Sequence, residues 1–164
     1  MGGTVFILGA GASAAAGAPL MANFLDVARD VLAAGKAEQD EAAFREVFAG
    51  ISALQLAQSK ATLDLKNIES IFTAFEMARL FGRLGDLDKE RVDNLPQALR
   101  RLIVRTLDVS VQFPVVATDY GWDITPPRPY QSFGDLVFGL KERGDSVSVI
   151  TFNYDIGVDY GLTV

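Results

Sequence analysis

The chain has 164 residues, of which 49% are apolar, and its formal net charge is −6. This length and composition predict one globular domain with its own core and exclude a disordered chain. The acidic balance argues against nucleic-acid binding, which needs clustered Lys and Arg, and no stretch reaches the roughly 18 apolar residues of a membrane span. The lack of cysteine and of a basic signal-peptide region leads us to expect a cytoplasmic protein.

The N-terminal residues predict a strand followed by a nucleotide-binding loop. A β-branched and aromatic run over residues 4–8 is typical of a strand covered on both faces in a parallel sheet. It leads into Gly9-Ala10-Gly11-Ala12-Ser13, with Gly17 and Pro19 beyond. Glycines at this place let a pyrophosphate approach main-chain N–H groups at the start of a helix. A tight Gly-x-Gly turn that binds nothing is the alternative.

The residues after this loop depart from an ordinary dinucleotide-binding fold. That fold has a third glycine where Ala14 stands, and a second strand with a ribose-binding acid about 20 residues on. After Gly35 the apolar residues instead continue at helical spacing. A dehydrogenase or a flavin protein is therefore disfavoured.

Three apolar stripes at helical spacing predict packing faces in the middle of the chain. They consist of Phe44, Val47, Phe48 and Ile51; Ile68, Ile71, Phe72, Phe75 and Ala78; and Leu95, Leu99, Leu102, Ile103 and Leu107. Asp93 or Asn94 is predicted to cap the third helix, with Pro96 in its first turn. The notable basic patch consists of Arg100, Arg101 and Arg105. Its helical spacing favours a solvated face over a partner surface.

The proline-rich segment 114–129 predicts an irregular loop that acts as a lid or a docking surface. Residues 113–118 are a third candidate strand at its start. A helical stripe over residues 130–140 then ends at Gly144 and feeds the last strand. The end of the chain is therefore predicted to be a helix–strand unit.

The last predicted strand, residues 146–152, carries polar residues at its C-terminal tip. Its apolar and β-branched alternation runs directly into Asn153-Tyr154-Asp155. Ligands of open α/β sheets bind beyond the carboxyl ends of strands, so this tip and the glycine loop would face one crevice if the two strands are parallel neighbours. The alternative is that Asn153 and Asp155 form a turn or cap a helix.

Three segments together resemble the sirtuin-like family, and most closely its prokaryotic branch. They are Gly9-Ala-Gly-Ala-Ser13, Gly17-Ala-Pro19 and Thr151-Phe-Asn-Tyr-Asp155, separated by a long helical insertion. Asn67-Ile-Glu69 resembles a further segment of that branch. Its members are similar to sirtuins in their NAD pocket but often hydrolyse NAD, typically as effector domains of anti-phage defence systems. The resemblance implies an α/β, Rossmann-like parallel sheet with a large helical insertion.

The resemblance also implies roles for individual residues. The pyrophosphate of NAD would be held by Gly9, Ala10, Gly11, Ala12 and Ser13. Gly17 and Pro19 would shape the loop closing over it. The nicotinamide ribose would lie beside Thr151, Asn153 and Asp155. Asn153 is the expected catalytic residue, because family members use this asparagine to orient a ribose hydroxyl or a water, and Asp155 is the second choice.

Two absences separate the chain from the family pattern. It has no cysteine, so it lacks the zinc ribbon of deacylating sirtuins, and we expect neither deacylation nor a bound metal. It also has no histidine, whereas the family's catalytic histidine lies downstream of the asparagine motif. We therefore expect the chain to be incomplete. Two or three strands leave an open sheet edge, so further strands are expected after Val164 or from a partner chain.

Three functions remain open from the sequence. The first is an NAD hydrolase that releases nicotinamide and ADP-ribose. The second is a sirtuin-like sensor or scaffold that binds NAD or a related nucleotide without cleaving it. The third is an unrelated α/β interaction protein in which the glycine loop is only a turn. A sensing partner protein or a homo-oligomer is implied by the resemblance alone.

Overall fold

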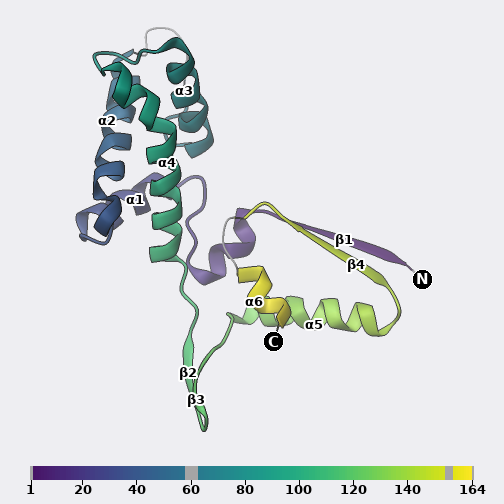
Figure 1. Ribbon diagram of the computed structural model, residues 1–164. Coiled ribbons are helices and arrows are strands. Elements are labelled where there is room, and N and C mark those ends of the chain that lie inside the picture. Colours follow the sequence, from purple (N-terminus) through teal and green to yellow (C-terminus); the bar gives the residue numbers. More distant parts are fainter. Residues whose placement is uncertain (1, 58–62, 154–156, 164) are drawn as a thin grey trace. The chain divides into compact units, whose positions relative to one another are not determined.

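The computed structural model of the protein describes residues 2–57, 63–153 and 157–163 (Figure 1). The chain divides into two compact units, one formed by residues 1–20 and 110–164 and the other by residues 21–109. We call them the sheet unit and the helical unit. The sequence predicted one globular domain, whereas the helical insertion has a hydrophobic core of its own. None of the described helices is both long and apolar enough to cross a bilayer.

The helical unit is built from amphipathic helices whose apolar stripes meet in one core, as their spacing predicted. Its helices are α1 (Phe24–Ala33), the short 3-10 helix η2 (Glu38–Asp40), α2 (Glu41–Ala57), α3 (Ile68–Phe81) and α4 (Lys89–Ser110). The largest fully buried side chains include Phe44, Val47, Ile71, Phe75, Leu95, Leu99 and Leu102. Residues 24–33 form α1 and residues 41–57 form α2 (Figure 1), so the chain is helical where a dinucleotide fold would place its second strand.

Helix α4 begins earlier than the sequence predicted. Its first residue is Lys89, and Pro96 lies inside the helix. The start is marked by Asp88, whose Oδ1 accepts the backbone N–H of Arg91 at 2.9 Å. Val92 is fully buried, so the apolar stripe already begins one turn before Leu95. The prediction of a cap at Asp93 or Asn94 was therefore wrong.

The arginines of α4 form contacts within the helical unit. Arg101 Nε donates to Asp40 Oδ1 at 2.7 Å, and Arg105 Nε donates to the Lys36 carbonyl at 2.8 Å. Arg91 is paired with Glu46 of α2 at 2.8 Å, and this hydrogen bond raises the pKa of the arginine. The predicted basic patch therefore joins α4 to its neighbours.

The hydroxyl of Thr106 is fully buried in α4 and has no hydrogen-bond partner among the described residues. Thr106→Val keeps the shape of the side chain and removes the unsatisfied oxygen, so it is expected to stabilise the helical unit by about 1 kcal/mol. Thr106→Ser keeps the oxygen and removes a methyl group, so a loss of about 1 kcal/mol is expected. Urea unfolding of both variants checks this, and a less stable valine variant would show that the hydroxyl is satisfied.

The sheet unit contains two neighbouring parallel strands, β1 (Gly3–Leu8) and β4 (Ser146–Thr151). Gly3 lies opposite Ser146, and Leu8 lies opposite Thr151. Helix α5 (Arg128–Glu142) contacts β4 and also α6 (Gly157–Thr163). The ring of Phe133 on α5 packs edge-to-face on Phe6 of β1, with centroids 5.1 Å apart. Both strands were predicted, and their parallel pairing is confirmed.

The opposite face of this sheet is open in the described part of the chain. Val5 and Ile7 of β1 are 59% and 69% exposed, and Ile150 of β4 is also exposed. The prediction that residues 4–8 are covered on both faces was therefore wrong, because α5 packs on one face alone. The structure shows a mixed α/β protein with a two-stranded parallel sheet.

A β-hairpin lies where the sequence predicted an irregular loop. Strands β2 (Val115–Thr118) and β3 (Gly121–Ile124) pair antiparallel in a sheet of their own. The chain turns through Asp119 and Tyr120, and Gly121 takes a φ of +136° that other residues rarely adopt. The candidate strand at residues 113–118 therefore pairs with its own neighbour in sequence and does not extend the parallel sheet.

Candidate functional site

The two segments with candidate site residues leave the same edge of the parallel sheet. Leu8 and Thr151 are the last paired residues of β1 and β4. The N–H of Phe152 donates to the Leu8 carbonyl at 3.1 Å, which continues the pairing beyond both strands. Ligands of α/β sheets bind beyond the carboxyl ends of the strands, and both predicted segments begin at this edge.

The glycine loop leads into a 3-10 helix, η1 (Ala10–Ala16), where the sequence predicted the start of an α-helix. Gly9 is extended, and its carbonyl accepts the N–H of Ala12 at 2.9 Å. The N–H groups of Ala10 and Gly11 precede the first hydrogen bond of η1, so they have no acceptor within it. They can donate to an anion, although so short a helix adds little dipole.

Neither backbone strain nor packing requires glycine at positions 9 and 11. Both residues have φ outside the left-handed region. A Cβ atom built on either residue would have no other atom within 4 Å. The loop therefore faces open space at these positions. A ligand that approaches the main chain closely would use this space, and a side chain would fill it.

A direct hydrogen bond joins the two segments. The side chain of Ser13 is 1% exposed, and its Oγ accepts a hydrogen bond from Asn153 Nδ2 at 2.7 Å. The sequence analysis predicted both residues as site residues, but it could not predict this hydrogen bond, because the two residues are 140 positions apart. The structure thus brings the end of the glycine loop against the tip of β4.

Thr151 makes the turn after β4. Its Oγ1 accepts the backbone N–H of Asn153 at 3.1 Å, so the turn predicted as an alternative role for Asn153 is formed by the threonine hydroxyl. The Asn153 carboxamide is half-buried and reaches across to Ser13. With Nδ2 engaged there, Oδ1 is the atom that can accept a hydrogen bond from a ligand hydroxyl. Asp155 lies outside the described residues.

Gly17 and Pro19 form the far side of the loop. Gly17 has a φ of +90°, and a Cβ atom there would lie 2.6 Å from the carbonyl oxygen of Ser110. The Ala16 carbonyl next to it accepts the N–H of Gln112 at 2.8 Å. Pro19 is buried. A close backbone approach explains the glycine at position 17 without any ligand.

The surroundings of the loop are poor in cationic groups. Residues 1–20 and 144–164 contain no Lys, Arg or His. A phosphate here would be bound by main-chain N–H groups. Two depressions of the described structure lie in the helical unit, and neither is lined by residues of the glycine loop. Among the described residues, no group of three acidic, His or Cys side chains could hold a metal ion.

Comparison of the chain with protein-family models, curated proteins and solved structures finds no significant match.

Proposed function

We propose that the protein is an NAD-binding module of the sirtuin-like kind, and that it hydrolyses NAD to nicotinamide and ADP-ribose. The proposal includes a Rossmann-like sheet that is larger than the two described parallel strands. It also includes a role as an effector domain in bacterial defence, which rests on the resemblance of the motifs alone. NAD is the proposed ligand, and no metal is required.

The observation that carries this proposal is the hydrogen bond between Ser13 and Asn153. It places the last residue of the glycine loop beside the residue that the motif resemblance makes catalytic. The two glycines at the start of the loop face open space, as a pyrophosphate-binding loop requires. The parallel register of β1 and β4 supports a ligand that spans both strand ends.

The chemistry asked of these residues is positioning. The nicotinamide of NAD leaves a cationic ring and becomes neutral, so the enzyme does not need the general acid of ordinary glycoside hydrolysis. Asn153, fixed through Nδ2, can hold a ribose hydroxyl or a water with Oδ1. Ser13 acts as a positioning residue, because its oxygen orients this amide.

Binding without cleavage is the second candidate function. The observation that favours it is the absence of histidine from the chain, since the resembled family uses one for catalysis. A sensor or scaffold would need the same loop and the same amide. Binding and nicotinamide release are therefore separate tests.

Asn153→Ala tests the proposal by proton NMR, which follows the line widths of NAD and the appearance of nicotinamide together. The wild type is expected to broaden the NAD resonances. Loss of one hydrogen bond should weaken binding about tenfold and slow any nicotinamide release about 100-fold. Asn94→Ala is the matched control, because Asn94 is an exposed asparagine on α4. It is expected to change neither NAD binding nor nicotinamide release. Sharp NAD lines with the wild-type protein would overturn the proposal, and release that Asn153→Ala does not slow would overturn the catalytic role.

A further inference from the structure

The outer face of α3 carries large apolar side chains that are exposed. Met77 is 45% exposed, Leu80 76% and Phe81 71%. Their spacing of three and four residues places them on one side of the helix. The core-facing side is formed by Ile68, Ile71, Phe75 and Ala78. A cluster of exposed large apolar side chains on one helix face marks an interaction surface.

This face has different shapes at its two ends. Beside the N-terminal half of α3 lies a shallow groove, lined in part by Leu63, Thr73, Ala74 and Met77. Leu80 and Phe81 stand out at the C-terminal end. If a second copy of α3 packs antiparallel, the protruding end of each helix lies over the groove of the other. A two-fold interface requires such a self-complementary surface.

The charges beside this face are also self-complementary. Glu69 lies in the first turn of α3, and Arg83 lies just beyond its C-cap, Gly82. Both side chains are exposed, and neither makes an ion pair with the residues that the structure describes. They lie the same number of residues from Glu76. If the two-fold axis passes beside Glu76, an antiparallel copy therefore brings Arg83 of one chain near Glu69 of the other.

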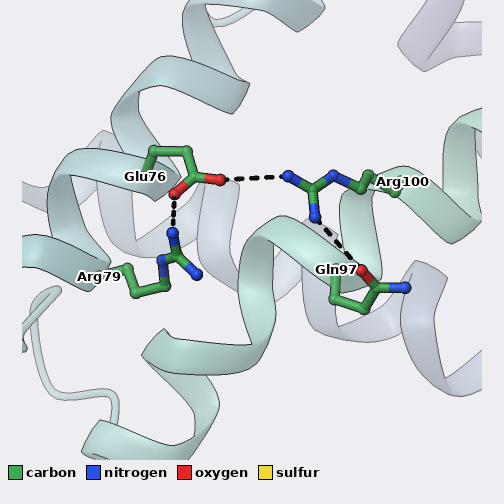
Figure 2. Close-up of polar contacts among 4 residues, drawn as sticks. All are labelled: Glu76, Arg79, Gln97 and Arg100. Carbon is green, nitrogen blue, oxygen red and sulfur yellow. Dashed lines mark hydrogen bonds and ion pairs between the residues drawn. The ribbon is translucent and has the colours of Figure 1, made fainter.

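The remaining charges on this side of α3 are already compensated. Figure 2 shows the Glu76 carboxylate between Arg79, at 2.7 Å, and Arg100 of α4, at 3.5 Å. The Arg100 guanidinium also lies over the ring of Phe72, 5.3 Å from its centroid. These contacts hold the flank of α3 against α4. Glu69 and Arg83 are left as the charges that a partner can meet.

We propose that the outer face of α3 is a homodimer interface, in which α3 of a second copy packs antiparallel across the two-fold axis. Leu80 and Phe81 of each copy supply the apolar contacts over the groove of the other copy, on either side of the two-fold axis, and Glu69 pairs with Arg83 of the other copy at both ends. A contact made by one helix pair is small, so the dimer is expected to be weak, with a dissociation constant on the order of micromolar. This inference does not depend on NAD binding.

Sedimentation equilibrium of the full chain over a wide concentration range tests the apolar contacts. The wild type is expected to change from monomer to dimer as its concentration rises. Leu80→Glu should raise the dissociation constant at least about tenfold, because it buries a charge in the contact. Leu56→Glu on α2 is the matched control, since Leu56 is an 89% exposed leucine on another helix of the same unit, and no change is expected. A wild type that stays monomeric, or an unchanged Leu80→Glu dimer, overturns the proposal.

A charge exchange tests the antiparallel arrangement. Glu69→Arg and Arg83→Glu should each raise the dissociation constant several-fold, because each places like charges opposite one another. The double variant restores opposite charges and is expected to return the dissociation constant close to the wild-type value. Circular dichroism of each variant verifies that the exposed substitutions leave the fold intact. Additive losses in the double variant would overturn the proposed pairing.

Discussion

Gly9→Val is expected to abolish NAD binding while the protein remains at least as stable as the wild type. Gly9 is extended, with φ −112° and ψ −171°, a backbone region that valine adopts readily. No atom lies within 4 Å of the Cβ position, so the added side chain meets no protein group. Reduced freedom of the unfolded chain should even add about 0.4–1 kcal/mol of stability. The same side chain fills the space that the proposed pyrophosphate needs.

The test combines NAD titration by proton NMR with urea unfolding. Gly139→Ala on α5 is the control, because Gly139 also has open space at its Cβ position and lies away from the loop in sequence. It is expected to keep NAD binding and to gain about 0.5–1 kcal/mol, since alanine is the better helix former. Unchanged binding by Gly9→Val would remove the glycine loop from the ligand site. Loss of folding would show a structural role for Gly9 that the open space does not suggest.

Gly17→Ala is expected to destabilise the sheet unit by about 3 kcal/mol. This is the opposite of the stability gain expected for Gly9→Val, although both glycines belong to the same predicted site. Two effects add here. A φ of +90° costs a residue with a side chain about 1–2 kcal/mol. The new Cβ atom would also lie 2.6 Å from the Ser110 carbonyl oxygen, and such overpacking typically costs about 1–3 kcal/mol.

Gly144→Ala separates these two effects. Gly144 has a similar φ of +82° and lies in the same unit, but no atom is within 4 Å of its Cβ position. The Gly144→Ala variant should therefore lose only about 1–2 kcal/mol of stability, through backbone strain alone. Hydrogen exchange of the β1 and β4 amides measures the stability of the sheet unit separately from the helical unit. Equal losses in the two variants would contradict a close contact between Gly17 and Ser110.

The sequence predicted the elements with strong local patterns. Helices α2 and α3 follow from apolar residues at helical spacing, and β1 and β4 follow from β-branched runs. Their parallel pairing was a hypothesis, because the glycine loop and the tip of β4 would face one crevice only if the two strands are parallel neighbours. The bond between Ser13 and Asn153 could not be predicted, since no local pattern reports which side chains meet over 140 positions.

The wrong predictions have local causes. The hairpin of β2 and β3 was missed because prolines on both sides of it suggested a loop, while the turn at Gly121 was overlooked. The start of α4 was misplaced because Pro96 was taken as a first-turn residue. The open face of β1 was missed because the composition of a strand indicates that it can be buried, but not what covers it.

The pairing of β1 with β4 also bears on the order in which the chain assembles. Its paired residues, such as Gly3 and Ser146, are 143 positions apart, and forming so long a loop from an unfolded chain is slow. The helical unit is contiguous in sequence, from residue 21 to residue 109, so it can form before the strands meet. Once folded, it replaces most of the loop with a rigid body. We therefore expect prior folding of the helical unit to lower the entropy that strand pairing must overcome.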